Sequence, residues 1–309
     1  ATHGTHHRYE PWEALVVTAE HDYDLFCQLG DMTYNDGAET LPEYRAKWQQ
    51  ALKTTGYRAL LPRAGSYYVW DDHEFINDSK LYGLPPAQLE AGLDAFFEAV
   101  PAERLPDDQL WTSYRWGKTA EFFLLDCRLE RQPDTRKSDD PIYISKKQIA
   151  WLKQALQQSP CHFKVLLNSV PITKMPPIWL KQSDRWQGYA KQREELLDHL
   201  TQNKVSNVWF LTGDFHAGMV SRVESKGPRS QYWEIMAGPG GNGPQPLWLM
   251  VQLNPGSINE VAPADQFDHF SGDFAATLIT FDPQKDAVRI RFIDAKNKKT
   301  IYDQWLSQS

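Results

Sequence analysis

The sequence predicts an α/β fold built as a single domain over residues 1–309. Helical and strand-like periodicities alternate along the first two thirds of the chain, and the last third is more strand-like. Hydrophobic residues make up 41% and charged residues 24%, which is ordinary for a soluble globular protein. We find no internal repeat and no linker that divides the chain. A chain of 309 residues is long enough to bury a substantial core.

The first 70 residues are predicted to form two helices and two strands. A helix is expected from about Pro11, with Trp12, Leu15, Val16 and Ala19 on one face. It is followed by a strand at 24–29, a helix at 42–53 and a strand at 66–70.

Residues 79–118 are predicted to be a helical excursion. Its helix carries Leu89, Leu93, Phe96, Phe97 and Val100 at helical spacing. Beyond it we expect strands at 121–125, 163–167, 208–211 and 232–236, helices at 147–157 and 189–202, an ordered loop at 171–186 and a turn cluster at 238–244. A C-terminal β-hairpin is expected at about 275–294, because its second strand alternates apolar with charged residues.

Charge and cysteine content exclude several classes of function. The net charge of −7 argues against non-specific binding of nucleic acids or anionic membranes, which favours basic surfaces. It leaves anionic substrates open, because bound cations would dominate the local field. Cys27 and Cys127 lack Cys-x-x-Cys spacing and are expected as buried thiols. No stretch approaches the roughly 20 apolar residues of a membrane span.

Three acidic segments stand where strand-like stretches end. They are Gly30-Asp31-Met32-Thr33-Tyr34, Trp70-Asp71-Asp72-His73-Glu74 and Gly213-Asp214-Phe215-His216. Several strands must each deliver hard ligands to one point in a two-metal hydrolase, and these segments match that requirement. We therefore expect a hydrolase of phosphate esters.

The ligand types narrow the choice of metal. Oxygen-rich sites with one or two imidazoles suit Fe³⁺, Mn²⁺, Ca²⁺ or Zn²⁺. Tyr34 could reach the same ion as Asp31, and phenolate ligation favours a trivalent metal. Each segment alone also fits an ordinary turn or a solvated charged loop. Their joint occurrence at three strand ends favours the metal site.

The motifs resemble those of the alkaline phosphatase D (PhoD-like) family of metallophosphoesterases, which is related to the purple acid phosphatases. Two further segments match the family. Asn168-Ser169-Val170-Pro171 resembles its Asn-x-Val-Pro motif, and the stretch Asp184–Tyr189, followed by Arg193, resembles its Asp-x-Trp-x-Gly-Tyr motif. The resemblance implies a β-sandwich flanked by helices, in a four-layer αββα order.

The resemblance also implies roles for single residues. Asp31 would bridge two metals, and Tyr34 and His216 would bind a ferric ion. His73 would donate a proton or stabilise the transition state. The second metal, Ca²⁺ or alternatively Mn²⁺ or Zn²⁺, would be bound by Asp72, Asn168 and Asp214.

Arg128 is a candidate from its position rather than from the resemblance. It follows a strand and could clamp a phosphate oxygen, with a structural ion pair as the alternative.

One departure concerns the first metal. Family members carry a cysteine ligand, preceded by a strand, just upstream of a segment like Ala1-Thr2-His3-Gly4. We expect that this chain lacks both, or that it is a fragment. His3, His6 and His7 are then weak substitutes for the cysteine.

The expected reaction is a two-metal in-line attack of metal-bound hydroxide on a small phosphate ester, with His73 assisting the leaving alkoxide. A mainly phosphodiesterase activity and a catalytically dead phosphate- or metal-binding homologue remain alternatives. The resemblance favours a periplasmic or extracellular protein, and a cytoplasmic location stays open.

Overall fold

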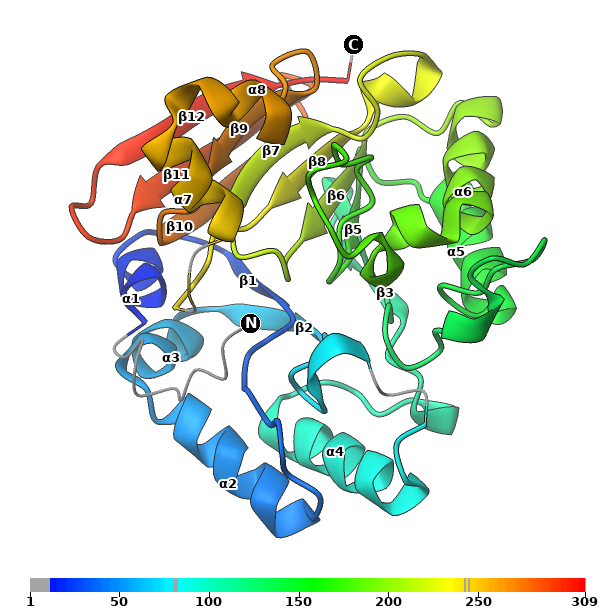
Figure 1. Cartoon of the computed structure of the whole chain (residues 1–309), viewed down its shortest axis with the longest axis vertical. Coiled ribbons are helices and arrows are strands. Elements are labelled where there is room, and N and C mark those ends of the chain that lie inside the picture. The colour runs from blue at the N-terminus through cyan, green and yellow to red at the C-terminus, as the bar shows by residue number, and fades with distance from the viewer. Residues whose placement is uncertain (1–11, 80–82, 242, 244, 309) are drawn as a thin grey trace.

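The computed structural model describes residues 12–79, 83–241, 243 and 245–308 (Figure 1). Helices and strands alternate up to residue 212, and strands dominate the remainder. The helices are α1 (Glu13–Ala19), α2 (Leu41–Leu52), α3 (Thr55–Leu60), α4 (Pro86–Ala99), α5 (Lys146–Gln158), α6 (Ala190–Gln202), α7 (Pro246–Leu253) and α8 (Ile258–Val261). The strands are β1 (Leu25–Leu29), β2 (Gly65–Val69), β3 (Thr112–Trp116), β4 (Ala120–Leu124), β5 (Phe163–Leu167), β6 (Val208–Thr212), β7 (Gly218–Arg222), β8 (Trp233–Met236), β9 (Phe267–Ser271), β10 (Ala275–Asp282), β11 (Ala287–Asp294) and β12 (Thr300–Leu306).

A seven-stranded mixed sheet forms the centre of the molecule, in the order β3-β4-β5-β6-β8-β7-β9. Strands β4, β5, β6 and β8 run parallel, and β4, β6 and β8 are buried along their whole length. Successive side chains point to opposite faces of a strand. Accordingly, Phe122 and Leu124 join one apolar cluster, while Phe123 joins a second cluster beneath α5 and α6.

A second layer of strands packs on one face of this sheet. It contains the parallel pair β1-β2 and the antiparallel sheet β10-β11-β12. Tyr67 of β2 stacks on Tyr114 of β3 with ring centroids 5.0 Å apart, and Phe281 of β10 lies 5.3 Å from Phe163 of β5. A cavity of about 440 Å³ lies between this second layer and the seven-stranded sheet, and residues of β1, β10 and β4 line it.

Helices cover both outer faces. On the far side of the large sheet, α5 and α6 pack over β4 to β6, and α7 packs over β7 and β9. On the other side, α1 packs over β10 and β11, and α2 to α4 form the lower part of the molecule in Figure 1. The predicted fold class, a β-sandwich flanked by helices, is confirmed.

Local sequence signals explain where the long helices begin. Thr40 and Glu43 form a capping box at the start of α2, and Pro42 lies in its first turn. The Ser145 side chain accepts a hydrogen bond from the Gln148 backbone amide and caps α5. Pro86 begins α4, which packs against α2.

The structure departs from the predicted elements in three ways. The excursion at 79–118 is not wholly helical, because its last residues form β3, which pairs with β4. In α1, Val16 is half-buried while Ala14 and Val17 are buried, because α1 packs on β10 and β11 through Ala14 and Val17. Trp12 lies outside the helix in a left-handed conformation. The elements that sequence patterns missed are α3, α7, α8, β3, β7, β9 and β12.

The expectation of buried thiols is confirmed for Cys127 and is wrong for Cys27. Cys127 and Cys161 are buried thiols and Cys27 is half-buried, and none of them forms a disulfide. Within the described parts of the chain, every helix is too short or too polar to cross a bilayer.

A substitution at Phe96 on α4 would test how tightly α2 and α4 pack. Phe96 makes edge-on contacts with Trp48, Trp70 and Phe97 at centroid distances of 5.9, 5.1 and 5.3 Å. We expect Phe96→Ala to lower the free energy of unfolding by about 3–5 kcal/mol, because it leaves a cavity among rigid rings. Urea titration would measure the loss. Exposed Glu90 lies on the same helix, and Glu90→Ala should stay within about 0.5 kcal/mol of wild type.

Candidate metal centre

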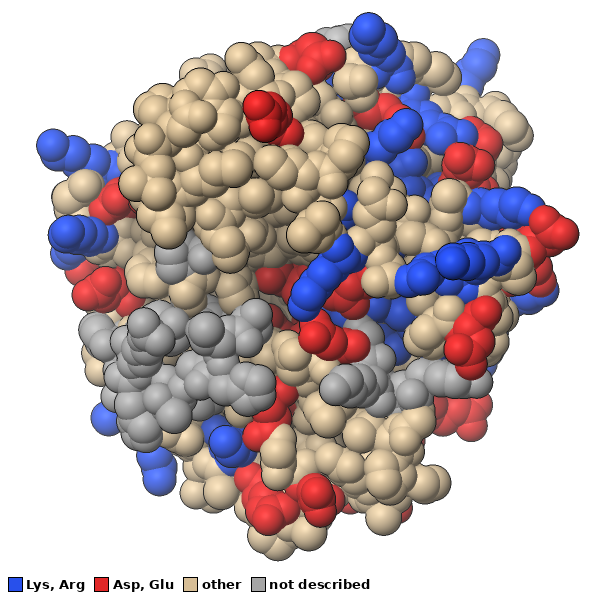
Figure 2. Space-filling view, in the orientation of Figure 1, with Lys and Arg blue, Asp and Glu red and all other residues tan. Residues whose placement is uncertain are grey.

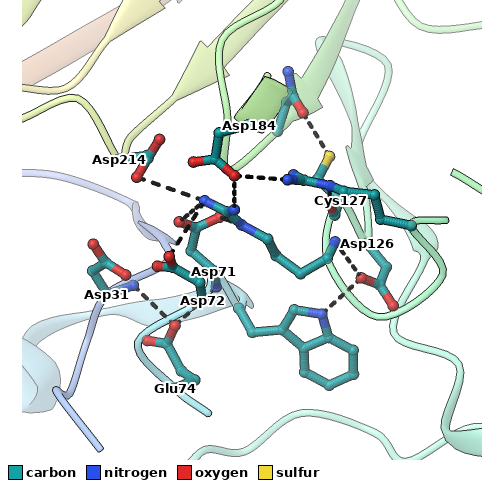
Figure 3. Close-up of polar contacts among 12 residues, drawn as sticks. Asp31, Asp71, Asp72, Glu74, Asp126, Cys127, Asp184 and Asp214 are labelled. Atoms are coloured by element: carbon teal, nitrogen blue, oxygen red, sulfur yellow. Dashed lines mark hydrogen bonds and ion pairs between the residues drawn. The ribbon is translucent and has the colours of Figure 1, made fainter. Parts of the chain in front are cut away.

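The candidate ligands follow the carboxyl ends of parallel strands that meet at one edge of the two layers. Asp31 follows β1, Asp71 and Asp72 follow β2, and Asp214 follows β6. Leu29 pairs with Val69 at the ends of β1 and β2, so the acidic segments that follow lie side by side. Figure 3 shows these four carboxylates gathered around one region.

The backbone at these strand ends is held in unusual conformations. Gly30 has φ +95, and a Cβ there would lie 2.4 Å from the Asp71 Cβ. Asp31, Asp214 and His216 adopt positive φ values of 56, 66 and 49. Non-glycine residues in this region are strained, and such residues cluster at functional sites. Gly30 is therefore required for the β1 and β2 loops to approach each other.

Four carboxylates lie together, with Asp71 and Asp72 buried and Asp31 and Asp214 half-buried. Asp31, Asp71, Asp72 and Asp214 each offer an oxygen, and these oxygens all lie within 4.8 Å of one another. Asp31 and Asp72 also form a group of this kind with His73. Among the described residues, Oδ1 of Asp31 and Oδ1 of Asp72 are buried without a hydrogen-bond partner. Buried carboxylate oxygens that lack protein donors fit cation ligands.

The raised pKa values of the clustered aspartates also indicate a site for cations. Burial and then the neighbouring carboxylates raise the pKa of Asp31 well above its usual range. Burial likewise raises the pKa of Asp214, and it raises the pKa of Asp72 to about 6 despite the opposing Arg128. Bound cations would reverse these shifts, because a nearby positive charge favours the ionised carboxylate.

A smaller cavity adjoins the cluster and brings Tyr34 and His216 beside two of its aspartates. It measures about 140 Å³, and Asp31, Tyr34, Asp214 and His216 line it. Burial lowers the pKa of His216 to about 4, which keeps the imidazole neutral, as metal binding requires. Asp31 and Asp214 thus belong both to the carboxylate cluster and to the lining of this cavity.

Glu74 is the residue that ties the first two loops together. Its carboxylate accepts hydrogen bonds from the backbone amides of Asp31 at 3.0 Å, Met32 at 2.5 Å and Asp71 at 2.8 Å. Burial raises its pKa to about 7, and the backbone donors oppose the rise. Glu74 is therefore part of the scaffold that positions Asp31 and Asp71.

His73 is oriented by Asp36. Its Nδ1 lies 2.7 Å from Asp36 Oδ2, and its ring centroid lies 4.2 Å from that of Tyr34. Burial opposes protonation of His73, but the Asp36 hydrogen bond and the surrounding carboxylates outweigh it and raise the pKa. Asp36 is in turn fixed by the Asn77 amide at 2.7 Å.

Arg128 lies fully buried among the acidic residues. Its Nε and Nη2 atoms donate to the two oxygens of Asp71 at 2.6 Å, and Nη1 donates to Asp184 at 2.6 Å. An oxygen of Asp214 lies 3.6 Å from Nη2 (Figure 3), and Arg131 also donates to Asp184, at 2.8 Å. The guanidinium is thus bound by carboxylates. Its contact with a phosphate oxygen stays a prediction.

Asn168 follows β5 and is fully buried beside the cluster. Its Oδ1 accepts hydrogen bonds from Trp186 Nε1 at 3.1 Å and from the Cys127 thiol at 2.8 Å. Its Nδ2 has no partner among the described residues. Ligation of a metal through Oδ1 therefore requires the amide to turn, and this role of Asn168 stays a prediction.

Comparisons with known proteins identify the family. The sequence profile of the PhoD-like phosphatases matches residues 3–270. The chain belongs to the PhoD-like phosphatase family. Alkaline phosphatase D of Bacillus subtilis (strain 168) is 26% identical over 260 residues. That alignment covers 69% of this chain, which spans only 44% of the length of the relative.

Solved structures share the fold. The structure of PhoD superposes with a TM-score of 0.69 at 20% identity, covering 95% of this chain and 69% of the other. A purple acid phosphatase from yellow lupin (Lupinus luteus) seeds gives 0.63 at 15%, covering 96% and 48%. A dimetal phosphatase from Danio rerio gives 0.57 at 15%, covering 97% and 88%. At these identities the likeness is one of fold.

Several residues of the candidate site were not singled out from the sequence. Asp71 and Glu74 belong to one of the three acidic segments. The sequence of that segment does not indicate that Asp71 binds Arg128 or that Glu74 accepts from backbone amides. Asp36 follows Tyr34 closely without a distinctive spacing. His3, His6 and His7, the possible substitutes for a cysteine ligand, lie outside the described residues.

Glu74 provides a test of the scaffold. In Glu74→Gln one oxygen becomes an amide that faces a backbone donor. We expect the free energy of unfolding to fall by about 1–3 kcal/mol and less metal to be retained after dialysis. Chemical denaturation and elemental analysis would measure the two effects. Glu43→Gln is the matched control, because exposed Glu43 also accepts from backbone amides. Equal losses in both variants would contradict a positioning role for Glu74.

Proposed function

We propose that this protein hydrolyses phosphate esters with the help of at least two metal ions. One observation carries the proposal. Four aspartates gather their oxygens beside a cavity lined by Tyr34 and His216. Two oxygens of these aspartates, Asp31 Oδ1 and Asp72 Oδ1, are buried and have no hydrogen-bond partner among the described residues. Membership of the PhoD-like phosphatase family supports the same activity.

The residues divide into two sets of ligands. Tyr34 and His216 would hold one cation and Asp72 the other, with Asp31 between the two. Asp214 lies in both groups and would serve the second cation, together with Asn168 if its amide turns. A phenolate favours Fe³⁺ at the first position, and the carboxylate-rich second position suits Ca²⁺, Mn²⁺ or Zn²⁺. When bound, these cations would supply Lewis-acid charge for the phosphoryl group and lower the pKa of an attacking water.

The residues of the chain provide orientation and proton transfer. The Asp36 carboxylate holds Nδ1 of His73, which leaves Nε2 as the nitrogen that gives a proton to a leaving oxygen. Arg128 neutralises Asp71 through two hydrogen bonds and so leaves Asp31 and Asp72 for cations. Gly30 and Glu74 keep the loops after β1 and β2 in register, so the ligands require little rearrangement.

The proposed substrate is a small phosphate ester. Monoesters and diesters remain open, and rates on 4-nitrophenyl phosphate and bis(4-nitrophenyl) phosphate would decide between them. The net charge of −7 supports a protein without non-specific affinity for nucleic acids. A phosphate-binding homologue without turnover is the alternative. It would bind phosphate after iron and calcium loading and hydrolyse neither ester.

Removal of the shared carboxylate tests the metal dependence. We expect Asp31→Asn to lower kcat by about a hundredfold or more, since even residues that only support metal ligands contribute 10–100-fold. Chelation should abolish wild-type activity, and metal addition should restore it. Rates on both nitrophenyl esters and metal content would be measured together. Asp303→Asn, in an exposed pair on β12, should keep wild-type rates. Full activity of Asp31→Asn would contradict the proposal.

The identity of the first cation can be tested at Tyr34. Iron-loaded protein should contain stoichiometric iron and show a visible phenolate charge-transfer band. Tyr34→Phe should lose the band, because it removes only the phenolic oxygen. Absorption spectra and elemental analysis would check this. Tyr44→Phe, which removes a buried hydroxyl bonded to the Phe75 carbonyl, should retain the band. A colourless wild-type protein that is nevertheless active would exclude a ferric phenolate.

A further inference from the structure

An apolar surface adjoins the candidate metal centre. The sequence has no charged side chain from Ile235 to Asn259, although 24% of the chain is charged. Helix α7 lies within this stretch and has the sequence Pro-Leu-Trp-Leu-Met-Val-Gln-Leu. Helices that are apolar all round are ordinarily buried, yet α7 lies at the surface of the molecule (Figure 1).

Three leucines of this region project into solvent. Leu249 and Leu253 on α7 are 58% and 79% exposed, and Leu180 in the neighbouring loop is 77% exposed. In the described parts of the chain, the other exposed large hydrophobic residues are Trp116 and Trp305. Figure 2 shows a broad surface almost free of charged side chains over α7, bordered by the acidic residues at the centre of that face. We refer to Leu180, Leu249 and Leu253 as the α7 surface.

A chain of aromatic contacts joins the α7 surface to the metal ligands. Trp248, beside Leu249, and Trp179, beside Leu180, both contact Phe270, with ring centroids 5.6 and 5.7 Å apart. Trp179 also contacts Phe215 at 5.8 Å. Phe215 stands between the candidate ligands Asp214 and His216. The two exposed segments therefore rest on one apolar cluster that ends at the metal centre.

Hydrogen bonds fix the position of α7 relative to that centre. The Gln245 amide donates to the His216 carbonyl at 3.0 Å, and its side chain donates to the Phe215 carbonyl at 3.0 Å. Gln245 Oε1 in turn caps the first turn of α7. The start of α7 is thus attached directly to the segment that carries Asp214 and His216.

We propose that the α7 surface binds an aliphatic group of the substrate, so that the preferred phosphate ester is an amphiphile. This inference rests on the proposed function. The α7 surface borders the acidic centre (Figure 2), and the start of α7 is hydrogen-bonded to the segment that carries Asp214 and His216, so an aliphatic group attached to the reacting phosphate would lie along this surface. The net charge of −7 also opposes docking on an anionic membrane. Exposed apolar patches of this kind commonly mark binding sites.

A series of alkyl 4-nitrophenyl phosphates tests the inference. The methyl, butyl and octyl diesters share one leaving group, and each would be assayed below its critical micelle concentration. We expect kcat/KM to rise at least tenfold from methyl to octyl, because a fully buried methylene contributes up to about fourfold in binding. In the Leu249→Gln, Leu253→Gln double variant the octyl-to-methyl ratio should fall at least fivefold. Trp305→Gln removes an exposed hydrophobic residue on β12 and should leave the ratio unchanged.

A binding measurement separates this inference from the proposed function. Calorimetric titration of metal-loaded protein with methylphosphonate and octylphosphonate gives a Kd ratio without turnover. Suppose that octylphosphonate binds more tightly than methylphosphonate, that the double variant loses this difference, and that no ester is hydrolysed. That result would contradict the proposed function and support the aliphatic site. Equal kcat/KM across the series together with equal Kd values would overturn the inference. The inference would also be overturned if the wild type were a dimer, the double variant a monomer, and the kcat/KM and Kd ratios the same in both proteins. The α7 surface would then bind a second copy of the chain.

Discussion

Buried carboxylates repel one another, and the architecture of this protein depends on how that repulsion is compensated. Asp31, Asp71, Asp72 and Asp214 bring their oxygens within 4.8 Å, and Arg128 is the guanidinium that lies among them. Arg128 is bound to Asp71 and Asp184, so its charge is already shared. The ionised cluster requires further positive charge, and metal cations supply it most directly.

The fold keeps these like charges together despite their repulsion. Parallel pairing of β1 and β2 places two acidic loops side by side, and Gly30 lets their backbones touch. Glu74 binds three backbone amides across the two loops and gives them a shared anchor. Positive φ values at Asp31, Asp214 and His216 show strain at the ligand positions, which the surrounding buried strands hold in place.

The sequence predicts those features that local patterns record. The strand-like runs that correspond to β1, β2 and β6 are recognisable in the sequence, and the acidic residues that follow them mark the edge where the candidate ligands meet. Strand β9 was missed because Asp268 and His269 interrupt its apolar pattern. Asp36 was missed as a positioning residue because its partner His73 lies 37 residues away along the chain, a distance that no local spacing encodes. Glu74 was missed because two of its three partners, Asp31 and Met32, lie 43 and 42 residues away.

Anomalous X-ray scattering from crystals of iron- and calcium-loaded protein tests the proposal that these residues hold two cations. We expect an iron peak in the cavity between Tyr34 and His216 and a second cation peak beside Asp72, with Asp31 between the two. Asp31 Oδ1 and Asp72 Oδ1, which lack hydrogen-bond partners among the described residues, would each face a cation. Metal-loaded crystals without a cation peak at these carboxylates would contradict it.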